Sequence, residues 1–329
     1  MRVALPVITP RAAPAMARVS LTDRCDMACV YCRPSRRDGY LPADERLDVD
    51  QWERLARALV AEGVRRVRVT GGEPLLHREV VDIARRIKSA GVTDLALTTN
   101  ASRLAAMAAP LRDAGVDRVT VSLDSLVPEV FARVTRGGDL SAVLAGVDAA
   151  LAAGFTEVKT NTVVLRGEND GELPSIARWA WALGVTPRFI EVMGVGEGAR
   201  VWREKLVTVS EMRRALDELL RDDTGERDAE RGPAKYVAAR DGSGRRVGFI
   251  TGMTDTYCAG CDRLRVTSDG VLRPCLATND GVSVVDAIDE GGGAVGERLA
   301  EAWAMKPDAS WKGCTEVTAR AVNMRATGG

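Results

Sequence analysis

Strand-like and helix-like segments alternate along most of the first 221 residues, and this alternation constrains the fold more than any other feature. Runs rich in β-branched residues are followed by longer segments of helical spacing, which mostly end at glycines such as Gly63, Gly91 and Gly115. The expected strands are residues 18–22, 65–70, 94–99, 119–123, 157–165 and 188–193. The expected helices are residues 48–62, 78–90, 141–153, 171–183 and 210–221, with another ending at 114. The pattern predicts parallel strands joined by crossover helices.

The residues with unusual chemistry favour a barrel over an open sheet. They lie on the expected strands or directly after them: Cys25, Gly72, Thr98, Ser122, Lys159 and Met193. A barrel gathers the carboxyl ends of its strands around one mouth, whereas an open sheet spreads them along an edge. We therefore expect an α/β fold, with a partial (β/α)6 TIM-like barrel in residues 1–221. A charged segment then opens a C-terminal α+β region, residues 222–329.

Charge and cysteine usage exclude several classes of protein. The 329 residues include 46 Lys plus Arg and 46 Asp plus Glu, so the net charge gives no general basic surface for nucleic acid. No segment is long and apolar enough to span a membrane, and the proline-interrupted residues 1–14 do not resemble a signal peptide. Seven cysteines, mostly in two short groups, argue against a disulfide framework and for a reducing cytoplasm.

The first cysteine group has the spacing C-x3-C-x2-C and consists of Cys25, Cys29 and Cys32. Three thiolates can hold three irons of a [4Fe–4S] cluster and leave the fourth iron open, whereas ferredoxin-type clusters take four cysteines. This spacing resembles that of the radical S-adenosylmethionine (SAM) enzymes, in which SAM chelates the open iron. A structural zinc site is the alternative, but it needs four ligands. No fourth ligand lies nearby, and the only histidine is His77.

The turn Gly71–Gly72–Glu73–Pro74 directly follows the second expected strand. Two glycines permit close approach of the backbone to a ligand, and the Glu73 carboxylate can accept hydrogen bonds from an ammonium group. An ordinary turn between strand and helix is the alternative. One strand–helix unit after the cysteine group, however, the turn matches the segment that binds the SAM amino group in radical SAM enzymes.

A second cysteine group consists of Cys258, Cys261 and Cys275. It predicts a second [4Fe–4S] cluster with an open iron, and the alternative is a zinc site completed by Cys314. Between these cysteines lie Arg263 and Arg265, which face the same side if the segment is a strand. Two guanidinium forks on one side suit a phosphate group; a surface hairpin with outward charges is the alternative.

Further cations lie in or beside the expected strands, namely Arg18, Arg68, Lys159 and Arg188. Charged side chains are rarely buried without partners. If these four side chains point into a barrel, they require an anionic ligand.

Together these motifs resemble, nearly from end to end, the radical SAM GTP 3′,8-cyclase family that opens molybdenum cofactor biosynthesis. The resemblance rests on residues 21–25, 70–75, 97–100, 121–124, 188–191 and 258–270, on Cys275, and on the terminal Gly328–Gly329. It implies the radical SAM type of partial barrel, with the second cluster carried by the C-terminal region.

The resemblance also implies a role for each matching residue. Cys25, Cys29 and Cys32 would hold the SAM cluster, and Cys258, Cys261 and Cys275 the second cluster, whose open iron binds guanine. The expected SAM contacts are Tyr31, Gly71, Gly72, Glu73, Ser122 and Met193. The expected GTP contacts are Arg18, Arg68, Thr98, Lys159, Arg188, Arg263, Arg265 and the tail Gly328–Gly329. We count the first three cysteines, Arg263 and Arg265 as catalytic.

The implied reaction is cleavage of SAM to a 5′-deoxyadenosyl radical, which removes the ribose 3′ hydrogen of GTP. Ring closure from C3′ to C8 then gives 3′,8-cyclo-7,8-dihydro-GTP. The implied partners are GTP, a reductant protein such as a flavodoxin or ferredoxin, and a downstream cyclic pyranopterin monophosphate synthase. We expect a cytoplasmic monomer or homodimer that binds neither nucleic acid nor membrane.

Four positions depart from the usual pattern of the family. Arg33 stands where Met is common, Ala101 where Gly is usual, Arg66 where Lys is frequent and His77 where Arg is usual. They leave room for a paralogue that acts on another nucleotide or on a peptide, although a peptide-modifying enzyme would usually carry more C-terminal cysteines. A non-catalytic iron–sulfur scaffold would have no reason to keep the glycine turn or the inward cations.

Overall fold

The computed structural model describes residues 14–33, 39–223, 225–227, 232–255, 257–258, 261–291, 293–307, 322–324 and 326–328. The strands are β1 Met16–Ser20, β2 Arg66–Thr70, β3 Asp94–Thr99, β4 Arg118–Ser122, β5 Glu157–Val164, β6 Thr186–Glu191, β7 Glu226–Arg227, β8 Lys235–Ala238, β9 Arg246–Ile250, β10 Arg263–Val266, β11 Val271–Arg273 and β12 Val282–Ser283. The helices are α1 Val49–Ala61, α2 Val80–Ser89, α3 Leu104–Asp113, α4 Pro128–Thr135, α5 Leu140–Ala152, α6 Leu173–Ala182, α7 Gly198–Lys205, α8 Val209–Ala215, α9 Val285–Glu290 and α10 Ala294–Ala304.

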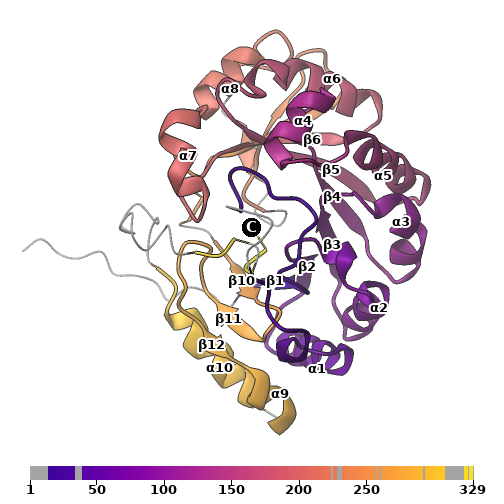
Figure 1. Cartoon of the computed structure of the whole chain (residues 1–329), viewed down its shortest axis with the longest axis vertical. Helices are drawn as coiled ribbons and strands as arrows, with labels where there is room; N and C mark the ends of the chain where they lie inside the picture. The colour runs from indigo at the N-terminus through magenta and orange to yellow at the C-terminus, as the bar shows by residue number, and fades with distance from the viewer. Residues whose placement is uncertain are drawn as a thin grey trace, which may run out of the picture.

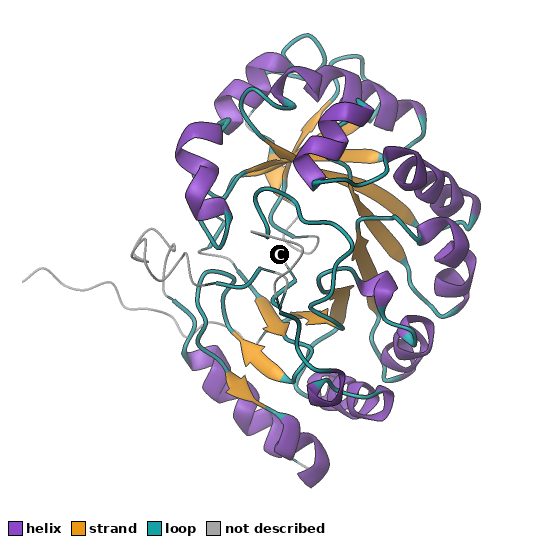
Figure 2. Cartoon of the chain, viewed as in Figure 1, coloured by secondary structure: helices purple, strands orange, loops and turns teal. Residues whose placement is uncertain are grey.

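All of the strands join one curved sheet in the order β12-β11-β10-β1-β2-β3-β4-β5-β6-β9-β8-β7. Strands β1 to β6 run parallel in sequence order, and the C-terminal region adds β10 parallel to β1 and β9 parallel to β6. The sheet has two free ends and is therefore not closed. Figures 1 and 2 show the crossover helices outside this crescent and the loops around its central opening. The predicted partial (β/α)6 barrel is confirmed.

Alternation within the strands separates the apolar core from a polar interior. In β2, Val67 and Val69 belong to the main hydrophobic core, whereas Arg66 and Arg68 do not. Parallel strands covered on both faces usually read as continuous apolar runs. The polar residues between the valines therefore indicate that the inner face of the sheet lines a polar site.

Local signals explain most of the helices. In α1, the Asp48 carboxylate accepts a hydrogen bond from the Gln51 backbone N–H, and the Gln51 side chain accepts one from the Asp48 N–H. Trp52, Leu55 and Leu59 of the same helix are buried. Among the described residues, none of the helices is long and apolar enough to cross a bilayer.

Some elements differ from the sequence-based expectation. Helices α4, α7 and α9 were not expected, because each is short. The helix expected over residues 210–221 ends at Ala215, and the chain then turns so that Leu220 forms a bridge with Ala239.

Candidate functional site

A cavity at the carboxyl ends of the central strands gathers most of the predicted site residues. Those that line it are Arg18, Cys25, Cys29, Tyr31, Cys32, Gly71, Gly72, Thr98, Ser122, Met193, Arg263 and Arg265. A second cavity beside it is lined by Cys258, Cys261 and Cys275 and shares Met193, Arg263 and Arg265 with the first. Gly329 and Cys314 lie outside the described residues.

The loop that carries the first cysteines is joined to the glycine turn by main-chain hydrogen bonds. The Gly72 N–H donates to the Thr22 carbonyl and the Glu73 N–H to the Arg24 carbonyl, each at 2.7 Å. A Cβ atom on Gly72 would lie 2.4 Å from the Arg24 oxygen, so only glycine fits there. The far side of the loop is held by α4, because Ala28 N–H donates to the Thr135 carbonyl at 3.1 Å.

The three thiols of the first group fit an iron–sulfur cluster. Burial raises the pKa of Cys25 to about 12 and that of Cys29 well above its ordinary value, and the Cys32 thiol raises both further. Thiols in such surroundings need cations to become thiolates. Among the described residues, no three Cys, His, Asp or Glu side chains stand close enough to share a single metal ion. A [4Fe–4S] cluster instead takes one thiolate on each iron, and the three thiols line the same cavity.

Glu73 is fully buried and does not line the cavity. Its carboxylate accepts hydrogen bonds from Leu75 N–H at 2.9 Å, Thr99 Oγ1 at 2.7 Å and Asn100 N–H at 2.6 Å. Burial raises the pKa of Glu73 to about 7, although these hydrogen bonds oppose the shift. The carboxylate therefore ties the end of β3 to the glycine turn.

Tyr31 points to the end of β4, where its hydroxyl donates to Asp124 Oδ2 at 2.6 Å. Asp124 also accepts from the Val163 N–H at 2.9 Å, and burial raises the pKa of Asp124 to about 6. Asp124 lines the cavity, and we had assigned it no role from the sequence. Its place after a strand was the signal that could have found it.

The second cysteine group lies among cations. Burial alone would raise the pKa of Cys261, but Arg263 and Lys306 lower it to about 7. The Lys306 ammonium donates to the Arg263 carbonyl at 2.6 Å and the Pro274 carbonyl at 2.8 Å. It thus links the two segments that supply Cys261 and Cys275. Three thiols and two nearby cations suit a second cluster with an anionic ligand.

Three arginines stand side by side across neighbouring strands. Arg18 of β1 pairs in register with Arg265 of β10 and with Arg68 of β2. Burial lowers the pKa of all three. Arg265 and Arg68 lower the pKa of Arg18 further, Arg188 does so for Arg68, and Arg263 does so for Arg265. The cost of this like-charge cluster indicates an anionic ligand.

The C-terminal tail reaches the same place. The Arg265 guanidinium donates to the carbonyls of Thr327 at 2.6 Å and Gly328 at 3.0 Å. Gly328 has φ +67°, and a Cβ there would lie 2.2 Å from the Thr70 side chain. The tail therefore needs glycine at this position.

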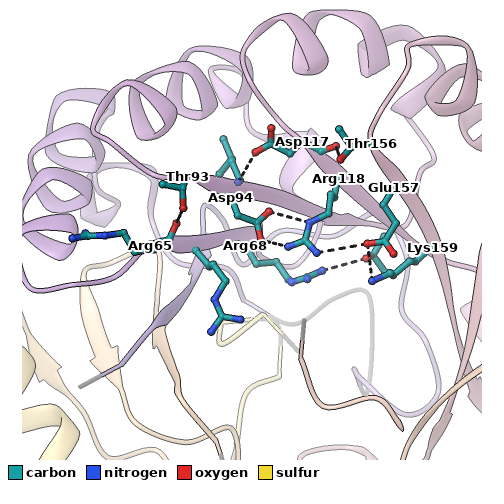
Figure 3. Close-up of polar contacts among 12 residues, drawn as sticks. Arg65, Arg68, Thr93, Asp94, Asp117, Arg118, Thr156, Glu157 and Lys159 are labelled. Atoms are coloured by element: carbon teal, nitrogen blue, oxygen red, sulfur yellow. Dashed lines mark hydrogen bonds and ion pairs between the residues drawn. The ribbon is translucent and has the colours of Figure 1, made fainter. Parts of the chain in front are cut away.

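Below the cavity, Arg68, Lys159 and Arg188 belong to a polar cluster at the amino ends of the strands. Arg68 donates to Thr98 and Thr120, and Arg188 donates to Thr120. Figure 3 shows Lys159 beside Glu157, which in turn faces Arg118. None of these three predicted side chains lines the cavity itself.

Two family profiles match the chain. The Radical SAM superfamily profile covers residues 19–180, and the Molybdenum Cofactor Synthesis C profile covers residues 185–311. A GTP 3′,8-cyclase of Rhodopseudomonas palustris is 44% identical over 272 residues, which are 80% of this chain and 76% of that protein. One from Pelotomaculum thermopropionicum is 39% identical over 295 residues, covering 88% of this chain and 90% of the relative. The chain belongs to the GTP 3′,8-cyclase family.

Solved structures agree with this family on the fold. Streptococcus suis SuiB bound to S-adenosylmethionine superposes with a TM-score of 0.62 at 14% identity, covering 89% of this chain and 67% of that one. The structure of anSMEcpe with bound AdoMet gives a TM-score of 0.55 at 14% identity, covering 80% and 74%. At such low identity the likeness supports the radical SAM fold alone.

In this cyclase-family chain, the sequence-based prediction missed side chains that hold the predicted site residues in place. Asp124, Glu157, Arg118 and Lys306 were given no role, although each contacts a predicted site residue or its segment. Strand register could have revealed Glu157, because it pairs with Arg118. No sequence signal points to Lys306.

Proposed function

We propose that this protein is a GTP 3′,8-cyclase in molybdenum cofactor biosynthesis. With two electrons from a reductant and one proton, it would convert GTP and SAM to 3′,8-cyclo-7,8-dihydro-GTP, methionine and 5′-deoxyadenosine. The observation that carries the proposal is the pair of adjoining cavities, each with three cysteines, separated by Arg263 and Arg265. One cavity suits SAM and the other suits the base of a nucleotide, so the reacting groups would meet between them.

The proposed cofactor contacts follow from the placement of the residues. Cys25, Cys29 and Cys32 would hold the first cluster, which when bound supplies the electron that splits SAM into methionine and a 5′-deoxyadenosyl radical. Gly71 and Gly72 line the cavity, so their main chain would lie close to bound SAM. The remaining proposed SAM contacts are Tyr31, Ser122 and Met193, with Glu73 acting through the turn that it anchors. Cys258, Cys261 and Cys275 would hold the second cluster.

The proposed GTP contacts are cations and small polar groups. Arg18, Arg263 and Arg265 line the cavity, and their forks can each take two oxygens of a triphosphate. The tail at Gly328–Gly329 would pack against the substrate and exclude water from the radical steps. The other proposed GTP contacts are Arg68, Thr98, Lys159 and Arg188. Positioning and charge complementarity, rather than acid–base pairs, would be this chain's contribution.

We extend the proposal to partners and organisation. The first cluster requires a low-potential electron, so a flavodoxin or ferredoxin is the proposed donor, and a reducing cytoplasm is the proposed compartment. The product would pass to cyclic pyranopterin monophosphate synthase. We keep residues 1–221 as the proposed SAM-binding barrel and 222–329 as the proposed second-cluster region, in a monomer or homodimer.

The test is anaerobic reconstitution followed by incubation with SAM, dithionite and GTP. A cyclase gives cyclised nucleotide by mass spectrometry and roughly eight irons per chain. The matched variants are Cys25→Ser, which should abolish SAM cleavage, and Cys258→Ser, which should spare cleavage without GTP but abolish cyclisation. Formation of 5′-deoxyadenosine without cyclised GTP would indicate a paralogue with another substrate. Roughly four irons and one zinc would mean that the second cysteine group is structural.

A further inference from the structure

A cluster of charged residues lies toward the amino ends of the barrel strands, whereas the cysteines lie at the carboxyl ends. We call it the floor cluster, and its members are Arg68, Asp94, Arg118, Glu157, Lys159, Arg188 and Arg246. Figure 3 shows the part that runs from Asp94 through Arg118 and Glu157 to Lys159. It comprises five cations and two carboxylates.

Glu157 is the carboxylate that several cations share. Its Oε2 atom lies 2.8 Å from Lys159 Nζ and 3.6 Å from Arg118 Nη1, and its Oε1 atom lies 3.7 Å from Arg246 Nη2. Arg118 also forms a two-pronged ion pair with Asp94. One carboxylate therefore serves three cations, and among the described residues Arg118 alone of the three has an ion pair with a second acid.

Charged or aromatic side chains from the neighbouring strands surround Lys159. It faces Arg118 on β4, Arg188 on β6 and Glu157 on β5, while Arg68 on β2 and Asp94 on β3 lie farther along the floor. On β8, the centroid of the Tyr236 ring lies 5.7 Å from the Lys159 Nζ atom and 4.3 Å from the guanidinium carbon of Arg246 on β9. The Lys159 side chain is only 4% exposed.

This excess of positive charge can be relieved if one cation loses its proton. An arginine side chain stays protonated in proteins, whereas a buried lysine can lose its proton. Burial and then Arg188 lower the pKa of Lys159 to about 7, although Glu157 opposes the shift. Among the floor cations, Lys159 is therefore the one that loses its proton most readily as pH rises.

The floor lies within reach of a ligand in the cavity. Asn161 stands two residues after Lys159 on the same face of β5 and lines the cavity. Two residues of a parallel strand span roughly 6.6 Å. The Asn161 Oδ1 atom is buried and has no hydrogen-bond partner in the described part of the chain. An anionic chain that enters the cavity and passes Asn161 thus approaches the Lys159 amine.

We infer that substrate binding is coupled to protonation at the floor: Lys159 takes up one proton from solvent as the triphosphate of the substrate approaches, and Glu157 positions its amine for this uptake. The inference rests on the proposed function, because it takes GTP as the anion. The balance is simple, since a neutral amine and a solvent proton give an ammonium ion. Glu157 is a positioning residue, because it acts through Lys159.

The experiment is calorimetric titration of the reconstituted enzyme with GTP at pH 8 in two buffers of different ionisation enthalpy. The wild type should take up a substantial fraction of one proton per GTP, because burial and Arg188 lower the pKa of Lys159 to about 7 before GTP binds. The terminal phosphate of GTP can also exchange protons. The Lys159→Arg variant is therefore titrated in parallel, because an arginine keeps the positive charge at this proposed GTP contact and lacks the lysine's share of the proton uptake.

The pH profile of GTP affinity supplies the second readout. Wild-type affinity should fall by up to about tenfold per pH unit above pH 7, and the Lys159→Arg profile should be flatter. In Glu157→Gln the amine loses its nearest anion, so the fall should begin at lower pH. A purely structural role for Glu157 would weaken binding equally at every pH.

The outcomes separate the inference from the proposed function. Equal proton uptake by the wild type and Lys159→Arg, with GTP bound by both, would overturn the coupling and leave the cyclase proposal standing. Absence of GTP binding by the wild type would overturn both. Greater uptake by the wild type, together with a shifted Glu157→Gln profile, would support the coupling.

Discussion

Replacement of Gly72 by alanine tests whether the glycine turn sets the position of the first cysteine loop. The three atoms nearest to a Cβ at this position are all main chain: the Arg24 carbonyl oxygen at 2.4 Å, the Arg24 carbonyl carbon at 2.7 Å and the Asp23 oxygen at 2.7 Å. Ordinary carbon contacts are about 3.5–4.0 Å, so the loop must move by roughly 1 Å. A main chain cannot swing aside as a side chain can, and Cys25 is the next residue along it.

The size of the effect follows from these contacts. Overpacking of a rigid site costs about 1–3 kcal/mol. Displacement of the loop also weakens the two main-chain hydrogen bonds from Gly72 and Glu73, each worth about 0.5–1.5 kcal/mol. A total loss near 3 kcal/mol corresponds to a melting temperature lower by about 4 °C in a chain of 329 residues.

The matched control is Gly171→Ala. A Cβ at Gly171 meets nothing within 4 Å, and the backbone there is not left-handed. This variant should be neutral or more stable by up to about 1 kcal/mol, because alanine restricts the unfolded chain. The assay is thermal unfolding together with iron counting after reconstitution. Gly72→Ala should also lose iron from the first cluster. Equal melting temperatures and equal iron content in the two variants would refute the reasoning.

Four further predictions rest on single contacts. Arg265→Ala removes the donor to the two tail carbonyls, so GTP affinity should fall at least roughly tenfold while the first cluster is retained; unchanged affinity would contradict this. Lys306→Met should speed iron loss from the second cluster to a chelator, with Lys306→Arg restoring retention, since a cation is needed between its two segments. The raised pKa of Glu73, about 7, means that the folded state binds more protons than the unfolded chain between pH 4.5 and 7. The free energy of unfolding should therefore fall as pH rises through this window, and denaturant titrations of Glu73→Gln should show a smaller fall. Ala101 has φ +63°, so Ala101→Gly should raise the free energy of unfolding by about 1 kcal/mol, measured the same way.

The elements with local signals were predictable from the sequence. Asp48 and Gly63 bracket α1 within one residue, because capping and termination depend on neighbours in the chain. Helix α4 has only a proline near its start and spans eight residues, so it was missed, yet its last residue, Thr135, holds the first cysteine loop. Short helices of this kind are stabilised by tertiary packing rather than by propensity.

The candidate site was predictable where residue type and spacing carry the chemistry. The cysteines and the paired arginines could be placed from the sequence, whereas Glu157 gains meaning only from its register with Arg118. Glu73 shows what the sequence context leaves out. The context predicts contact with a ligand, and the folded chain adds three hydrogen bonds from its own donors that no local pattern revealed.

The pairing of β10 with β1 also bears on how the chain is made. Strand β1 is the first strand in the described chain, but its outer neighbour comes from residues 263–266. During synthesis, the edge of β1 stays unpaired until residues 263–266 have left the ribosome. Contacts between such distant segments slow folding, and an open edge invites association with other chains. A chain cut before β10 therefore loses more than the second cysteine group, because the strand that leads into the first group is left with an exposed edge.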